Sequence, residues 1–537
     1  MSSLVRVPVP DHGVIVRRTG ARGYVYQVLS TFRNQRGQPT NTRVSIGKID
    51  EATGMLIPND AYWRYYPCPD IVWLEGEDAI RSVGTVFLTS RVMADLGLTA
   101  IVETVFGTGL GGQVATLAHY MASRGNVMDH LESWCSDHTW AEEPLTGQQA
   151  SRVFASITHR ERMEFFGLWV AAQPPGSYLA YDVTSLSSYA QGITDTEWGH
   201  NRDGDRLPQI NLGCYVNQDS AAPVFYLTYP GSITDVSHLE SMMAYNTDLH
   251  IEAVGFVMDR GFCSTKNIQW MHTHHLDVIM GTDIGHKTIR EAVDQVRTGI
   301  CSIRHLTSQG VYARSVRGRF YGVTCTVHVY HDPIRAEHQR QDLFRLVGVW
   351  EDRLGKAETI SPADARKASA WFTIERRRDG SFTFARDVDK IDHAARNNGF
   401  FTLLTTTDYD AETTLAIYRR RDVIEKSFDE IKNHIDMKRL RTHGDATTDG
   451  KLFCAFLALI ITAHIQSVLS PVMRERSWSK NRVIHELDKI RVVTTGQGTR
   501  LMNPISKTQR SILTAFGLTP DDVTDYVRAH DPYVSNS

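Results

Sequence analysis

Apolar and polar positions alternate, or form short apolar runs, through the middle of the chain, and this pattern predicts a sheet. The runs are bounded by turn formers such as Pro174-Pro175-Gly176, which is typical of strand ends. The expected strands cover residues 178–183, 209–216, 223–229, 253–258 and 277–281. Helices are expected over residues 232–246 and 266–274, between the last three strands. The pattern therefore predicts a mixed α/β core in the order three strands, helix, strand, helix, strand.

A further helix is predicted over residues 418–432, which read YRRRDVIEKSFDEIK. Its buried stripe is expected to consist of Ile417, Ile424, Phe428, Ile431 and Ile435. To one side of this stripe, four polar residues fall within about 60° of one another on a regular helix: Tyr418, Arg421, Glu425 and Lys432. A helix that packs by one face and carries acidic and basic side chains beside that face could bind a metal ion and a phosphate backbone. For this segment alone, a solvated charged face is the favoured interpretation of the pattern.

Two aspartates occupy the ends of predicted buried strands. Asp182 lies in SYLAYDVTSL and Asp259 in GFVMDRGF. Ligand sites in α/β sheets form beyond the carboxyl ends of strands, so both residues are candidate ligands. For either residue alone, a role as a helix cap or turn former is the competing interpretation. Three carboxylates without His or Cys would favour a hard cation, Mg²⁺ or Mn²⁺.

The spacing Y-x2-R-x3-E-x6-K resembles the signature of one group of bacterial insertion-sequence transposases, the insertion-sequence-four superfamily of DDE transposases. D-V-T at Asp182 and D-R-G at Asp259 resemble the surroundings of the first two acids in that group. The resemblance implies a ribonuclease-H-like fold and makes Asp182, Asp259 and Glu425 the catalytic acids and metal ligands. Asp429 lies about 20° from the stripe, so geometry does not exclude it, and only the motif favours Glu425.

The same resemblance implies a metal-dependent nuclease and strand transferase. Such an enzyme would bind the terminal inverted repeats of its element, cut the ends with two Mg²⁺ or Mn²⁺ ions, and join the 3′-hydroxyls to target DNA. It implies DNA contacts for Tyr418, Arg421 and Lys432, and a homodimer on double-stranded DNA. Two alternatives remain at this point: a domesticated DNA-binding protein without catalysis, and a nuclease without strand transfer.

The remaining segments suggest six regions. Residues 1–80 are β-rich with a hairpin over 23–48, and residues 81–172 are helical. The resemblance implies that residues 81–172 are a candidate DNA-end-binding domain, and packing explains these helices equally well. The core occupies residues 173–283 and 399–474, with Phe400 to Thr405 as a returning strand. Residues 284–398 show β-branched and aromatic runs, which predict a mainly β insertion. Residues 475–537 are expected to form a helical appendage.

Composition adds limits to this picture. The net charge of −3 excludes a general attraction to DNA, but residues 415–444 hold eight basic and five acidic side chains. Seven scattered cysteines without a C-x-x-C pair, and a beginning without a signal-peptide core, predict a cytoplasmic location. The apolar run 452–463 is too short to span a bilayer and predicts a buried helix, with no membrane partner.

Overall fold

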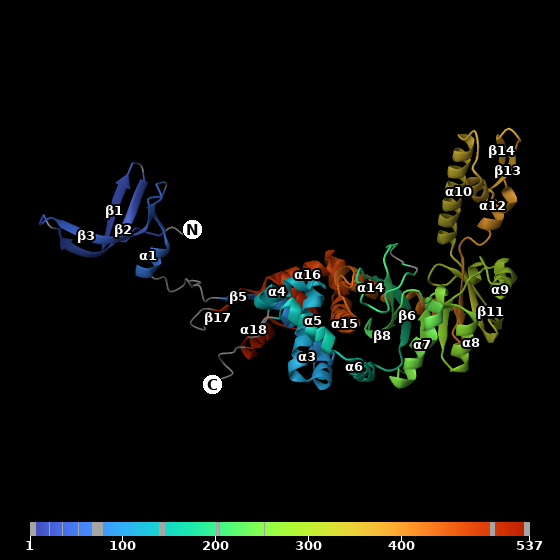
Figure 1. The fold of residues 1–537 in the computed structure, drawn as a ribbon, viewed down its shortest axis with the longest axis horizontal. Helices are drawn as coiled ribbons and strands as arrows, with labels where there is room; N and C mark the ends of the chain where they lie inside the picture. Colours follow the sequence, from blue (N-terminus) through green and yellow to red (C-terminus); the bar gives the residue numbers. More distant parts are fainter. Residues whose placement is uncertain are drawn as a thin grey trace. The chain divides into compact units, whose positions relative to one another are not determined.

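The computed structural model describes residues 7–20, 22–34, 36–51, 53–66, 79–138, 145–199, 201, 204–251, 253–494 and 500–530. The chain forms two compact units (Figure 1). The N-terminal unit comprises residues 1–79 with 493–500, and the main unit comprises 80–492 with 501–537. The region borders expected at residues 172, 283, 398 and 474 all fall inside the main unit.

The N-terminal unit contains an antiparallel sheet of four strands in the order β1-β2-β3-β4. These are β1 (Val14–Thr19), β2 (Arg22–Arg33), β3 (Pro39–Ile49) and β4 (Leu56–Pro58), followed by helix α1 (Asp60–Tyr65). One face of the sheet packs on α1 around a small core of Val25, Ile46, Leu56, Tyr62 and Trp63. The hairpin expected over residues 23–48 is confirmed as β2–β3.

The main unit is built on an eight-stranded mixed sheet in the order β11-β12-β15-β10-β9-β6-β7-β8. Its strands are β6 (Tyr178–Ser187), β7 (Gln209–Asn217), β8 (Pro223–Pro230), β9 (Gly255–Met258), β10 (Val278–Gly281), β11 (Tyr312–Phe320), β12 (Val323–His331) and β15 (Phe400–Thr405). Helix α7 (Asp235–Asp248) follows β8, and α8 (Thr265–Thr273) follows β9. The predicted order of strands and helices is confirmed, as is the return of the chain in β15.

Strand alternation decides which side chains of the sheet face the segment that contains Phe428. Tyr181 packs against Tyr215 and Phe262 on one face of the sheet. Asp182, the next residue, therefore projects from the opposite face and lies across from Cys214 in the pairing of β6 with β7. Cys214 lines a small cavity together with Phe428. The Asp182 face is thus the face on which the segment containing Phe428 packs.

Most remaining helices of the main unit share one hydrophobic core with the sheet. They are α2 (Gly84–Asp95), α3 (Leu98–Arg124), α4 (Leu131–His138), α5 (Gly147–Ser156), α6 (His159–Ala171), α15 (Asp445–Arg476), α16 (Lys480–Leu487), α17 (Lys507–Ala515) and α18 (Pro520–Ala529). Short elements are η1 (Met128–His130), β5 (Ala79–Ser82), β16 (Arg491–Thr494) and β17 (Arg500–Met502). Residues of α16, α17 and α18 belong to this core, so the C-terminal helices are not an appendage.

Helix α15 contains the apolar run that the sequence singled out. By length and composition this 32-residue helix could cross a membrane, but 72% of its most apolar window is buried inside the protein. Gly450 of α15 lies so close to Phe154 of α5 that a Cβ there would stand 1.9 Å from the Phe154 carbonyl oxygen. Helix α15 is therefore a core helix, and α5 packs closely against it.

The insertion is mixed, and the prediction that it is mainly β is wrong. Strands β11 and β12 join the edge of the large sheet, and β13 (Phe372–Arg376) pairs with β14 (Phe382–Arg386). More of the insertion is helical, in α9 (Lys287–Arg297), α10 (Pro333–Gly355), α11 (Pro362–Ala368) and α12 (Val388–Ala395), with a short turn η3 (Ile303–His305). One of the β-branched and aromatic runs behind that prediction, LFRLVGVWED at residues 343–352, lies in α10. Its residues Leu343, Val347, Trp350 and Leu354 pack on one small core at helical spacing.

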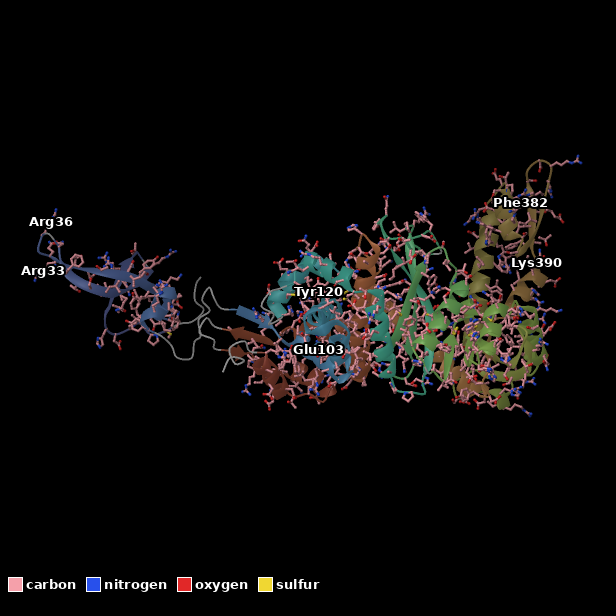
Figure 2. The ribbon with its side chains drawn as sticks, turned by 60° about the horizontal axis from the view of Figure 1, so that its bottom comes forward. Arg33, Arg36, Glu103, Tyr120, Phe382 and Lys390 are labelled. Carbon is pink, nitrogen blue, oxygen red and sulfur yellow. The ribbon has the colours of Figure 1, made fainter. Side chains whose placement is uncertain are left out.

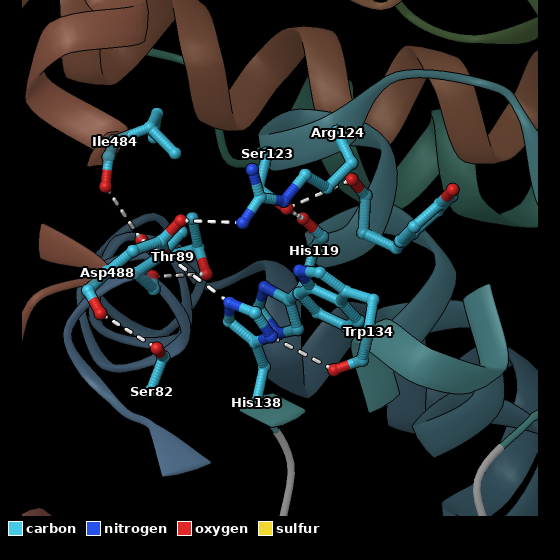
Figure 3. Close-up of polar contacts among 11 residues, drawn as sticks. Ser82, Thr89, His119, Ser123, Arg124, Trp134, His138, Ile484 and Asp488 are labelled. Atoms are coloured by element: carbon cyan, nitrogen blue, oxygen red, sulfur yellow. Dashed lines mark hydrogen bonds and ion pairs between the residues drawn. The ribbon is translucent and has the colours of Figure 1, made fainter. Parts of the chain in front are cut away.

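A buried polar network connects α2, α3, α4 and the residue after α16 (Figure 3). Asp488 accepts hydrogen bonds from Thr85 Oγ1 at 2.5 Å and from Arg124 Nη2 at 2.8 Å. His138 Nε2 lies 3.5 Å from the same carboxylate. Burial acts to raise the pKa of Asp488, but the hydrogen bonds and charges of His138, Thr85 and Arg124 outweigh it and lower the pKa. The network anchors the C-terminal helices to the helical layer.

Candidate active site

The two candidate aspartates lie at neighbouring positions of adjacent strands. Strand β6 pairs with β9 in parallel, with Tyr181 opposite Met258, so Asp182 and Asp259 follow the same rung. Asp182 is 5% exposed, and its Oδ1 accepts a hydrogen bond from the Val183 N–H at 2.8 Å. Asp259 is partly exposed and also caps the short turn η2 (Arg260–Phe262) through the Gly261 N–H at 2.7 Å. Asp259 therefore has both expected features: it caps a turn, and it lies at the carboxyl end of a strand in the sheet.

The helix expected over residues 418–432 is not regular. It consists of α13 (Ala411–Arg419), α14 (Asp422–Asp429) and a π-helical turn η4 (Glu430–His434). Between α13 and α14 the backbone bonds tighten to i→i+3 spacing, as in Arg421 N–H to the Tyr418 carbonyl at 3.1 Å. The π turn then changes the angular register again. The continuous helix is the part of the prediction that is wrong, while the expected apolar stripe, Ile417, Ile424, Phe428, Ile431 and Ile435, is confirmed as buried.

Arg421 brings two of the three candidate acids together. Its Nη2 donates to Glu425 Oε1 at 2.7 Å, and its Nη1 lies 3.5 Å from Asp182 Oδ2. The exposed fractions of the side chains are 15% for Arg421, 8% for Asp182 and 59% for Glu425. One guanidinium thus supplies the positive charge that compensates a buried carboxylate on the sheet and an exposed carboxylate on the helix.

Tyr418 closes the site on the side of Asp259. The Arg421 guanidinium lies 5.7 Å from the centre of the Tyr418 ring. Burial raises the pKa of the Tyr418 phenol, and the nearby positive charge of Arg421 opposes this rise. A Cβ at Gly281 would stand 3.0 Å from the phenol oxygen, so the absence of a side chain at position 281 makes room for the tyrosine.

A cavity of about 370 Å³ opens beside these residues, and we call it the Asp259 cavity. Its lining includes three arginines, Arg260, Arg335 and Arg421, with Asp259 and Asp283 as the acids. The sequence analysis missed Arg260, Arg335 and Asp283. Arg260 could have been found as the middle residue of D-R-G. Arg335 could not, because it lies at the start of α10 in the insertion and reaches the cavity only through the fold. Two acids and three bases leave an excess of positive charge suited to phosphate.

Two residues near the stripe are not part of this group. Lys432, expected to contact DNA, is 9% exposed and lies in the π turn, so its predicted DNA contact stays untested. Asp429 accepts a hydrogen bond from Asn433 Nδ2 at 2.7 Å and is not joined to Arg421 by any contact in the described residues. The link through Arg421 therefore favours Glu425 over Asp429 as the third acid.

The donor chemistry of the three carboxylates fits a hard divalent cation, because all the ligand atoms would be oxygens. Within the described residues, no three His, Cys, Asp or Glu side chains stand close enough together to hold a metal ion. In this state the guanidinium of Arg421 supplies the positive charge between Asp182 and Glu425. The residues thus have the right chemistry for Mg²⁺ or Mn²⁺, and Arg421 lies between two of them.

Comparison with known proteins gives two similarities. The family model described as "Transposase DDE domain" matches residues 173–461, which include Asp182, Asp259 and Glu425. The chain is also similar to a solved structure titled "Cryo-EM structure of piggyBac transposase synaptic complex with hairpin DNA (SNHP)". That similarity covers 84% of this chain and 83% of the other, at 9% identity and a TM-score of 0.38. No curated protein matches the chain.

Proposed function

We propose that this chain, which belongs to the transposase DDE domain family, is the active DNA transposase of an insertion sequence in the Y-R-E-K group. It would bind the terminal inverted repeats of its element, hydrolyse the phosphodiester bonds at the ends, and join the 3′-hydroxyls to target DNA. The observation that carries the proposal is the position of the three acids. Asp182 and Asp259 follow one rung of adjacent parallel strands, and Glu425 is joined to Asp182 through Arg421.

The three carboxylates would hold two Mg²⁺ or Mn²⁺ ions, with Asp182 and Asp259 contributed by the sheet and Glu425 by α14. Bound divalent ions would supply activation of the attacking water or 3′-hydroxyl and stabilisation of the leaving oxygen. The Glu425 side chain is flexible and more than half exposed, so its carboxylate would approach the two aspartates when Arg421 releases it. Asp182 is held in place by the buried strand β6.

The basic residues would bind the DNA backbone. Arg421, once released from the two carboxylates, would contact a phosphate of the bound end, and Arg260 and Arg335 line the same cavity. Tyr418 would position the DNA end next to Asp259. Lys432 would contribute positive charge behind the helix. On DNA the enzyme would act as a homodimer, in the bacterial cytoplasm, with double-stranded DNA as the partner at both the element ends and the target.

The proposal is tested by neutralising each acid without changing its size. We expect Asp182→Asn, Asp259→Asn and Glu425→Gln each to abolish Mg²⁺-dependent nicking, by at least about 100-fold, because each removes a ligand charge. Asp429→Asn is the matched control and should cleave normally. The substrate is a duplex that carries the inverted repeats flanking the coding sequence, and the products are resolved on a denaturing gel.

Binding of the same duplex in EDTA should survive in all four variants, since the acids do not hold DNA. A variant of the three acids that still nicks at the wild-type rate would remove that residue from the catalytic set. Cleaved ends that never join to a target plasmid would reduce the proposal to a nuclease. An unaltered chain that binds the repeats and never cuts them would indicate a DNA-binding protein without catalysis.

A further inference from the structure

The N-terminal unit carries a charge quite unlike that of the whole chain. Residues 12–49 contain seven Lys and Arg and no Asp or Glu, while the full chain has a net charge of −3. This stretch includes the three strands β1, β2 and β3. The acids that flank it, Asp11 and Asp50, lie outside the strands. A sheet whose charged side chains are all positive indicates a polyanionic partner.

Strand pairing places part of this charge on one face of the sheet. Val25 faces the core with α1, so Tyr24 and Tyr26 point to the opposite, outer face. Arg17 lies directly across from Tyr24 in β1, and Lys48 lies directly across from it in β3. Residues paired across strands project from the same face. A row of two cations flanking an aromatic ring therefore crosses the outer face.

A second contact between an arginine and a tyrosine lies beside this row, although the residues paired with Tyr26 itself are Ile15 and Ser45. Arg43 of β3 places its guanidinium 5.0 Å from the centre of the Tyr26 ring. Aromatic rings interleaved with arginine offer stacking and charge to the same ligand, which is a combination that suits nucleic acid. The outer face thus has the chemistry of a nucleic-acid-binding surface over all three strands.

The β2–β3 hairpin extends this surface as a ribbon. Residues 29–33 of β2 are exposed, including Leu29 at 50% and Phe32 at 52%. Arg33 and Arg36 lie at the far end of the ribbon (Figure 2), and Arg33 Nη1 donates to the Gly37 carbonyl at 2.8 Å, which orders the turn. Five extended residues span roughly 17 Å, whereas the major groove of B-DNA is about 12 Å wide and about 8.5 Å deep and admits a two-stranded ribbon. The ribbon is long enough to reach the groove floor.

We propose that the N-terminal unit is a duplex-DNA-binding module. The tip of the β2–β3 ribbon would enter a groove, and Arg33 and Arg36 at this tip would contact the phosphates along its walls. The outer face, with Arg17, Arg43 and Lys48, would contact the phosphates on either side. The choice of DNA over other polyanions rests on the proposed function, since a transposase must hold its ends. This adds a DNA-binding surface in the β-sheet unit to the candidate DNA-end-binding domain of residues 81–172, which stays a prediction.

The test measures binding of the full-length protein to a mixed-sequence 30-base-pair duplex. Fluorescence anisotropy is recorded in EDTA between about 50 and 200 mM NaCl. Arg33→Ala with Arg36→Ala removes two phosphate contacts, and each contact contributes about −0.9 to the slope of log K against log salt. The slope should therefore flatten by about 1.8, with a loss of affinity of roughly 30-fold at about 0.15 M salt. Arg17→Ala with Lys48→Ala should have a similar effect.

Two controls keep the test specific. Arg64→Ala removes one positive charge, half of what each double variant removes, from α1, which packs on the other face of the sheet, and it should leave the slope unchanged. Arg33→Lys with Arg36→Lys keeps the charge and should restore the slope, which separates charge from misfolding. Unchanged affinity and slope in the alanine variants would overturn the inference.

A second polyanion is tested in parallel. Vesicles containing phosphatidylglycerol replace the duplex in the same anisotropy assay. Loss of vesicle binding in the variants with intact DNA binding would overturn the inference in favour of a membrane surface. Failure of the proposed function has a separate readout, the absence of Mg²⁺-dependent cleavage by the unaltered protein, which EDTA binding does not involve.

Discussion

Replacing Arg421 by Met should destabilise the metal-free protein through the charge it leaves on Asp182. The substitution keeps most of the side-chain volume and removes the guanidinium that compensates both Asp182 and Glu425. Breaking a fully buried ion pair costs about 3–5 kcal/mol, and an exposed pair is worth about 0–1 kcal/mol. Asp182 is buried and Glu425 is 59% exposed, so we expect a loss of about 2 kcal/mol, nearly all of it from Asp182.

Divalent cations should reverse this loss. A cation that binds only the folded state stabilises it by mass action, and without Arg421 it meets no competing positive charge between the carboxylates. Mg²⁺ should therefore raise the unfolding temperature of Arg421→Met by more than it raises that of the unaltered protein. Differential scanning calorimetry of the full chain, in EDTA and in Mg²⁺, measures both quantities without any DNA.

Arg420→Met is the matched control. Arg420 is the preceding residue, is 48% exposed and pairs with Asp219 outside the site, so its loss should cost well under 1 kcal/mol and should not alter the Mg²⁺ response. Combining Asp182→Asn with Arg421→Met should recover most of the lost stability, because the buried charge is then gone as well. Equal stability of the Arg421 and Arg420 variants in EDTA, with equal Mg²⁺ shifts, would refute the reasoning.

Two further predictions concern the scaffold. Asp488→Asn should lower the free energy of unfolding by about 2 kcal/mol at neutral pH. Because the folded-state pKa of Asp488 is lowered, its stabilising contribution is complete above the unfolded pKa of about 3.9 and is lost as the pH falls through the folded-state pKa. Urea unfolding should therefore show the stabilities of the two proteins converging in acid, and a constant difference between them would contradict this prediction. Gly450→Ala should destabilise by about 1–3 kcal/mol or more in thermal unfolding, since its Cβ would meet the Phe154 carbonyl, whereas Gly444→Ala, with open space around it, should have little effect.

Local patterns of apolar and polar residues were sufficient to predict most of the core of this protein. The pattern of apolar residues around residues 178–281 specified five strands and two helices in their correct order. A strand buried on one face shows an apolar residue at every second position, a strand buried on both faces shows a short continuous apolar run, and a helix shows apolar residues every three to four positions. The spacing of Tyr418, Arg421 and Glu425, with D-V-T and D-R-G upstream, carried the resemblance that predicted three catalytic acids, and all three lie within the residues that the transposase DDE domain model matches. These features depend only on neighbours along the chain.

Tertiary packing decided the rest, because it depends on residues far apart in sequence. Leu343 and Val347 suit a strand by composition, yet a small core of the insertion selects the helical spacing that buries them together. The π turn that buries Lys432 is not visible in the residue spacing. Arg335 reaches the Asp259 cavity from the start of α10 only because the insertion folds back beside the sheet. The sequence by itself determined the order of the core strands and helices and the membership of the transposase DDE domain family. Only the fold could place Arg421 between two carboxylates, because that position requires strand β6 and helix α14 to meet.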